Sequence, residues 1–304
     1  MKNHKNILFI IFISLSIHQN APYFDSDMAY NFLIDQCKIG TRYPGSIEHV
    51  KTKDYIVNYL EDRVDSLIID KHLITHPYLD KKIELFNILG KFNPEIENRI
   101  MLLAHWDTRE IADKDPNVEN VNMPILGAND GASGIAVLMV LADMLNDYPL
   151  DNIGIDLLFV DGEDMGRSGD IEHFSIGTKL FSKSINHNNI KFAICLDMVA
   201  DKDAEFKIER FSFMQAEKQV REIWALANEL GYSEFTYNMQ HPIYDDHRAL
   251  FVETGIPSLD IIDFDYPYWH TLEDTPDKCS ARTLGIVGNV VSEYIYRIDK
   301  GQYE

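Results

Sequence analysis

Short motifs rich in aspartate, glutamate and histidine are spread along this chain, and most of them follow apolar segments. Four of the five come after runs typical of buried strands, at residues 100–104, 155–160, 192–196 and 258–262. The motifs are His105-Trp106-Asp107, Gly127-Ala128-Asn129-Asp130-Gly131, Asp161-Gly162-Glu163-Asp164, Leu196-Asp197-Met198 and Tyr268-Trp269-His270-Thr271. Carboxylate and imidazole groups are ligands for divalent metals, and a catalytic zinc keeps one coordination position open. The motifs therefore predict a metal-dependent enzyme of peptide or amide chemistry.

No single motif is specific, because His-x-Asp and Asn-Asp-Gly also occur in ordinary surface loops and turns. Their shared position carries the prediction, since strands of an open α/β sheet deliver the residues that follow them to one edge. Asp130 begins a predicted helix, whose dipole stabilises a carboxylate. Glu163 and Asp164 are neighbours after a strand and point in different directions. One of them can hold a metal while the other transfers protons.

The elements that must position these motifs alternate between helices and strands. Apolar residues at helical spacing predict helices at residues 26–37, 47–62, 131–146, 177–185, 215–230 and 281–297. Strands are predicted at residues 67–75, 83–90, 99–104, 155–160, 191–196 and 258–262. Residues 107–126 form a long irregular segment, which in a compact domain is often functional. The pattern predicts a single α/β domain over residues 22–304, with a mixed, twisted central sheet sandwiched between helices.

The composition is that of an acidic globular protein. The 304 residues are 45% hydrophobic and 25% charged, with a formal net charge of −21. Phosphates repel such a chain, which argues against nucleic acid or an anionic membrane as a partner. The charge would attract cations and positively charged peptides, and it is equally typical of a solvated surface. Cys37, Cys195 and Cys279 allow at most one disulfide, and the sequence leaves their pairing and the oligomeric state open.

The N-terminus has the pattern of a targeting segment. Lys2 and Lys5 precede an apolar stretch at residues 7–17, which has the length of a secretory h-region and is too short to span a bilayer. Residues 1–21 are therefore predicted to be a signal peptide or an N-terminal membrane anchor. The protein is expected to be exported, either to a periplasm or to the medium.

Two sets of motifs resemble a known enzyme family. The octapeptide Gly-Ala-Asn-Asp-Gly-Ala-Ser-Gly at residues 127–134 and the later Glu-Asp-x-Gly, Leu-Asp-Met-Val and Trp-His-Thr resemble the co-catalytic zinc aminopeptidases. Within that family the chain looks most like the zinc-dependent, animal-type glutaminyl cyclases. The features that favour the cyclases are Ala-His-Trp-Asp-Thr-Arg at 104–109, Asp-Asp-His-Arg at 245–248 and Ile-Asp-Phe-Asp-Tyr-Pro at 262–267. The resemblance covers residues 25–298.

The resemblance implies a role for each matching residue. In a cyclase, Asp130, Asp164 and His270 would ligate a single zinc. Glu163 would be the catalytic proton shuttle, and Asp197 would bind the substrate. These roles imply an acyltransferase that converts N-terminal glutamine of peptides and proteins to pyroglutamate with release of ammonia. One zinc per chain is expected.

Further roles depend on which branch of the family the chain represents. Asp246 would support the proton network, and Trp269 would wall the pocket for the substrate side chain. In an aminopeptidase, His105 and Asp197 would instead hold a second zinc. Asp164 stands where glutamate is usual in this family, and the shorter carboxylate would move the metal or the backbone by about one methylene.

Two alternatives to the cyclase follow from the same residues. A two-zinc aminopeptidase would use Glu163 to activate water and release the first residue of a peptide. A non-catalytic binding protein on this fold would not need an intact Glu163, which argues against it. Metal content separates the two enzymes, because the cyclase requires one zinc and the peptidase requires two.

Overall fold

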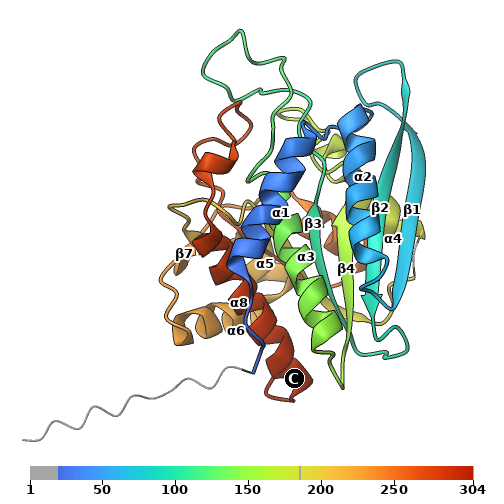
Figure 1. Ribbon diagram of the computed structural model, residues 1–304. Coiled ribbons are helices and arrows are strands. Elements are labelled where there is room, and N and C mark those ends of the chain that lie inside the picture. Colours follow the sequence, from blue (N-terminus) through green and yellow to red (C-terminus); the bar gives the residue numbers. More distant parts are fainter. Residues whose placement is uncertain (1–19, 185, 304) are drawn as a thin grey trace, which may run out of the picture.

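A six-stranded sheet forms the centre of the protein (Figure 1). The computed structural model describes residues 20–184 and 186–303. The strand order is β1-β2-β4-β3-β5-β8. The strands are β1 (Ser66–Thr75), β2 (Lys82–Phe92), β3 (Arg99–His105), β4 (Gly154–Val160), β5 (Ile190–Asp197) and β8 (Ser258–Ile262). The last four run parallel, whereas β2 is antiparallel to both of its neighbours, which confirms the predicted mixed sheet.

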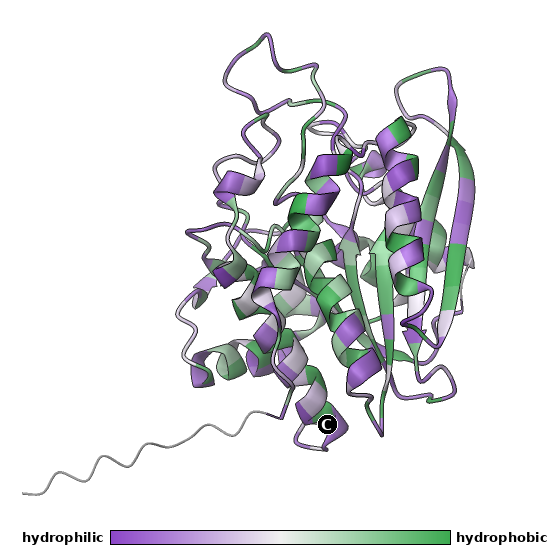
Figure 2. Ribbon diagram, in the orientation of Figure 1, coloured by the Kyte–Doolittle hydropathy of each residue, from purple (hydrophilic) through white to green (hydrophobic). Residues whose placement is uncertain are grey.

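Helices cover both faces of the sheet, as predicted (Figure 1). One layer contains α1 (Ser26–Ile39), α2 (Ile47–Leu60), α3 (Ala132–Asp147) and α8 (Ala281–Asp299), and the other contains α4 (Ile176–Ser184) and α7 (Asp246–Thr254). Alternating side chains of the central strands hold both layers. In β3, Leu102 joins the larger apolar cluster with α3, whereas Met101 and Leu103 join the smaller one with Leu250 of α7. Figure 2 shows the resulting apolar colour along β3, β4 and α3.

The C-terminal half contains elements that the sequence analysis missed. The helix predicted at residues 215–230 is α6 (Glu217–Glu229), and a short helix before it, α5 (Arg210–Gln215), was not predicted. Ala216 separates the two helices with φ −141° and ψ 43°. Strands β6 (Phe206–Ile208) and β7 (Phe235–Met239) pair in a small separate sheet. Helix α7 was not predicted either, since its nine residues lack a clear apolar period.

The described residues bear on two further expectations. The predicted signal or anchor segment lies outside them apart from Asn20 and Ala21. Within the described ranges, no helix is both long and apolar enough to cross a membrane. Cys37, Cys195 and Cys279 are all free thiols, so the disulfide that the sequence left open is not formed.

The start of α3 lies directly against the ends of β3 and β5. Gly131 has φ 137°, and a Cβ at this position would lie 2.8 Å from Cε1 of His105. A Cβ on Gly134 would lie 2.1 Å from the carbonyl oxygen of Leu196, far inside van der Waals contact. Only glycine permits this close approach. It brings the loop that carries Asp130 to the carboxyl edge of the parallel strands.

Candidate metal centre and active site

The predicted site residues meet at the carboxyl edge of the parallel strands. His105 is the last residue of β3 and Asp197 the last residue of β5. Glu163 and Asp164 follow β4, and Asp130 lies just before α3. Strands β4 and β5 flank β3 on opposite sides, so the side on which successive strands are added to the sheet changes at β3. Such a switch point opens a crevice in which α/β proteins bind ligands.

Asp130, Asp164 and His270 form a compact group of possible metal ligands. One ligand atom from each lies within 4.8 Å of the others, and all three side chains are buried. Nε2 of His270 is 3.3 Å from Oδ1 of Asp164 and 3.6 Å from Oδ2 of Asp130. Oδ2 of each aspartate has no hydrogen-bond partner among the described residues. Buried carboxylate oxygens require a positive partner, and two carboxylates with one imidazole fit a zinc ion that keeps an open position.

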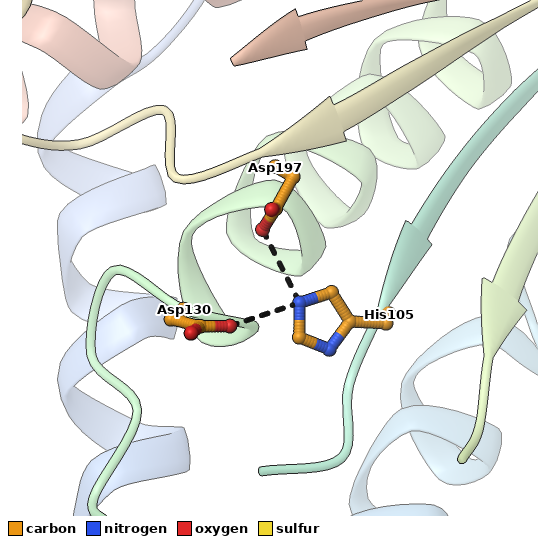
Figure 3. Close-up of side chains that lie close together, drawn as sticks. All are labelled: His105, Asp130 and Asp197. Carbon is orange, nitrogen blue, oxygen red and sulfur yellow. Dashed lines mark hydrogen bonds and ion pairs between the residues drawn. The ribbon is translucent and has the colours of Figure 1, made fainter. Parts of the chain in front are cut away.

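A second group shares Asp130. Nε2 of His105 lies 3.2 Å from Oδ1 of Asp130 and 3.2 Å from Oδ1 of Asp197, as Figure 3 shows. The three residues also meet the distance criterion for a metal site. Burial lowers the pKa of His105, but its contacts with the surrounding carboxylates outweigh burial and raise the pKa well above the ordinary value. The same geometry therefore serves either a second metal or a protonated His105 that neutralises two carboxylates.

Glu163 lies beside the first group on the wall of a cavity of about 40 Å³. Its Oε1 accepts a hydrogen bond of 3.3 Å from Oγ of Ser175. Burial and the nearby charge of Asp245 raise the pKa of Glu163 well above its ordinary value. A carboxyl group with raised proton affinity can both accept and return a proton near neutral pH. The structure thus places the predicted proton shuttle next to the predicted ligands.

The remaining predicted residues lie around this cavity at different depths. Trp269 lines it, and its ring stacks on that of His270 at a centroid distance of 3.9 Å. Asp197 also lines it, and burial raises the pKa of Asp197 to about 7 against the lowering effect of His105. Asp245 lines the cavity wall, but Asp246 does not. The Oδ1 of Asp246 accepts a hydrogen bond from Oγ1 of Thr178.

Two buried aspartates that the sequence analysis left without a role position the catalytic loops. The Asp107 carboxylate accepts hydrogen bonds from the backbone N–H groups of Glu163 (3.1 Å) and Asp164 (3.2 Å). The Asp274 carboxylate accepts those of Asn129 (2.8 Å) and Asp130 (3.1 Å). Asp107 is the last residue of the His105-Trp106-Asp107 motif. For Asp274, the only signal was its place four residues after His270.

A buried ion-pair network from the long irregular segment supports two of the ligands. Arg109 donates to both carboxylate oxygens of Asp113 at 2.8 Å, and its Nη1 donates to Oδ1 of Asp164 at 2.7 Å. Oδ1 of Asp113 in turn lies 3.2 Å from Nδ1 of His270. Metal-bound histidines commonly donate their second N–H to a carboxylate, which fixes the ring. Arg109 therefore holds the shorter Asp164 carboxylate and, through Asp113, the orientation of His270.

Removal of the Asp113 carboxylate should weaken zinc binding. We expect Asp113→Ala to lower zinc affinity by about 10- to 100-fold, because His270 loses the group that orients it. Competition with a chromogenic chelator measures this affinity. Glu119→Ala is the matched control, since it removes an exposed acid from the same segment. Equal zinc affinity in the two variants would show that Asp113 does not orient His270.

Known proteins share this fold. The model of peptidase family M28 matches residues 87–295. The structure of the glutaminyl cyclase of Bacteroides thetaiotaomicron bound to N-acetylhistamine is 34% identical, with a TM-score of 0.87, and the match covers 91% of this chain and 99% of that one. A Zn-dependent exopeptidase from Parabacteroides distasonis is 33% identical with the same coverage and TM-score. The glutaminyl-peptide cyclotransferase of Drosophila melanogaster is 25% identical over 258 residues, covering 77% of this chain and 70% of that protein. The resemblance seen in the motifs is confirmed, and the chain belongs to peptidase family M28.

Proposed function

We propose that this protein is a zinc-dependent glutaminyl-peptide cyclotransferase, which converts N-terminal glutamine of peptides to pyroglutamate and releases ammonia. The observation that carries the proposal is the position of buried Glu163, whose pKa is raised, beside the Asp130, Asp164 and His270 group. Relatives named as cyclases at 34% identity over nearly their full length support the same reaction. We propose one zinc per chain, held by Asp130, Asp164 and His270.

The reaction requires one proton to move between two nitrogens of the same substrate residue. Zinc bound at the three ligands would supply Lewis acidity at the side-chain amide carbonyl. Glu163 takes a proton as the α-amine nitrogen attacks the amide carbon. It returns a proton to the departing nitrogen, the original carbon–nitrogen bond breaks, and ammonia leaves with the lactam formed. No water is consumed.

The cavity walls hold the reacting groups together, which supplies much of the rate of an intramolecular reaction. Asp197 lines the same cavity, with its carboxylate close to that of Asp130, and accepts a hydrogen bond from the substrate amine or amide. Trp269 walls the pocket for the glutamine side chain. Asp245 and Asp246 add negative charge near Glu163, which keeps its proton affinity high. In this way Asp246 supports the proton transfer without touching the substrate.

An aminopeptidase is the second candidate, and one observation favours it. His105 and Asp197 complete a second ligand group around Asp130, and a solved relative at 33% identity is named a Zn-dependent exopeptidase. In that enzyme Glu163 would activate a water molecule.

For either activity we propose that residues 1–21 direct export of the protein. The support is the pair Lys2 and Lys5 and the apolar stretch that follows them.

The direct test is to incubate the purified protein with zinc and the dipeptide amide Gln-Ala-NH2. We expect one ammonia and one pyroglutamyl-alanine amide for each dipeptide consumed. A coupled assay measures the ammonia, and mass spectrometry identifies the amide. Asn-Ala-NH2 is the matched control, because its side chain is one methylene shorter and cannot close the same ring. Release of free glutamine without ammonia would show that the protein is an aminopeptidase and not a cyclase.

Glu163→Gln should abolish turnover without loss of zinc. The amide cannot accept and return a proton, so we expect kcat to fall by several powers of ten. Zinc content and the thermal unfolding midpoint should stay close to the wild-type values, since the change is nearly isosteric. A zinc-loaded, folded variant that retains a substantial rate would exclude Glu163 as the acid and base.

Asp197→Asn separates the two enzymes. In the cyclase, zinc content stays near one per chain and cyclisation slows at least tenfold, because a charged hydrogen bond contributes about 1.5–3 kcal/mol. In the aminopeptidase, the same change removes a ligand, and metal content falls from two towards one. Elemental mass spectrometry and the ammonia assay on one preparation distinguish these outcomes. Loss of one metal equivalent would overturn the cyclase.

A further inference from the structure

A buried carboxylate holds the first residues of the described chain. Glu293 of α8 is fully buried, and its Oε2 accepts hydrogen bonds of 2.8 Å from the backbone N–H groups of both Asn20 and Ala21. Its Oε1 accepts a further hydrogen bond, of 3.0 Å, from Nδ2 of Asn20. Two consecutive residues thus donate to both oxygens of one carboxylate, and we call this contact the N-terminal clasp.

The charges around the clasp explain why these donors matter. Arg297 donates through Nε to Oε1 of Glu293 at 2.8 Å, but its Nη1 and Nη2 donate to Glu229 at 2.9 and 2.7 Å. One guanidinium therefore serves two carboxylates. Burial raises the pKa of Glu293, but the N–H groups of Ala21 and Asn20 together with Arg297 outweigh burial and lower it. Without Asn20 and Ala21, this buried carboxylate would lose much of its compensation for lost hydration.

The residues that follow the clasp also pack along α8. Phe24 is fully buried, and a Cβ on Gly288 would lie 2.3 Å from Cζ of its ring. A Cβ on Gly285 would lie 2.8 Å from Cβ of Ser26. Glycine at both positions of α8 therefore leaves room for this segment. Residues 20–26 pack as part of the folded domain, and Figure 1 shows the start of the described chain beside the C-terminal half of α8.

The clasp lies at the end of the molecule opposite the catalytic cavity. Asp299, the last residue of α8, accepts hydrogen bonds from the backbone N–H groups of Asp151 and Asn152, which precede β4. This end of α8 therefore lies at the amino edge of the parallel strands, whereas the catalytic cavity lies at their carboxyl edge. Changes at the clasp are consequently separated from the proposed ligands and from Glu163 by the length of the sheet.

We propose that Glu293 is the binding site for the first residues of the mature chain, and that the export leader is removed on the N-terminal side of Asn20. The inference rests on the proposed export and not on the proposed reaction. Cleavage after Ala21, where the sequence pattern ends the leader, would remove Asn20 and Ala21 and leave Glu293 without their N–H groups. The clasp thus narrows the leader to residues 1–19.

The direct test is to express the full chain with its own leader in a bacterium that exports proteins. Intact mass and N-terminal sequencing of the exported protein then give its first residue. We expect a processed chain that still contains Asn20 and Ala21. A chain that begins at Ala21 or later would overturn the proposal, and so would a chain that keeps Met1. These results do not depend on ammonia release, so failure here is distinct from failure of the cyclase.

Chymotrypsin tests the clasp in the same processed protein, because Tyr23 is exposed directly after it. Glu293→Ala should be cut between Tyr23 and Phe24 about tenfold faster than the wild type, since proteolysis follows the population of the opened segment. Asn20→Gly removes only the Nδ2 donor at the surface and leaves the packing of α8 intact. This second variant should be cut severalfold faster.

Glu229→Ala is the matched control, because Glu229 shares Arg297 with Glu293 but does not contact Asn20 or Ala21. Its cutting rate should stay at the wild-type value. Zinc content and kcat/KM should be unchanged in all three variants, since the clasp lies far from the catalytic cavity. Wild-type cutting rates in both Glu293→Ala and Asn20→Gly would overturn the assignment of Glu293 as the binding site.

Discussion

The position of one carboxylate, that of Asp130, determines the geometry of the whole site. The backbone N–H of Asp130 donates a hydrogen bond to the buried Asp274 carboxylate, and the hydroxyl of Tyr266 donates to that Asp274 carboxylate at 2.8 Å. The glycines that follow let α3 begin against the strand ends, where His105 and Asp197 lie. Asp130 consequently belongs to both ligand groups. The number of metal ions bound is therefore decided by the residues around Asp130, since Asp130 itself is placed to ligate either ion.

Burial of many acids in a small volume is the second constraint on this site. Glu163, Asp197 and Asp246 are all at least nine-tenths buried, and burial raises the pKa of each. Buried carboxylates are tolerated only when cations, protons or hydrogen bonds compensate for lost hydration. Arg109 provides one cation, and bound zinc would provide more positive charge. The same constraint supports the proposed function, because a carboxyl group with raised proton affinity can both accept and return a proton.

Much of this arrangement could be predicted from local sequence patterns. Parallel strands end at one edge, so the residues after each apolar run were expected to meet, and Asp130, Asp164 and His270 do meet. The short helices α5 and α7 gave no comparable signal, because neither is long enough to show a clear apolar period. Positioning contacts were also missed, because Asp274 and Asn129 are 145 residues apart and no local pattern connects them. The role of Arg109 likewise depends on the path of a long irregular loop.

On the roles proposed above, the difference between a cyclase and a peptidase on this fold lies in the group around His105. A protonated His105 between Asp130 and Asp197 neutralises them without a metal, and it leaves Asp197 able to accept a hydrogen bond from substrate. A second zinc would instead be held by all three residues, and Glu163 would then activate a water molecule. Both states fit the same backbone, which is consistent with relatives at 33–34% identity that carry either name.

Anomalous diffraction at the zinc edge, from crystals grown with excess zinc, distinguishes these states directly. One strong peak per chain between Asp130, Asp164 and His270, with no peak at His105, is the predicted result. A second peak of similar height between His105 and Asp197 would contradict the single-zinc cyclase.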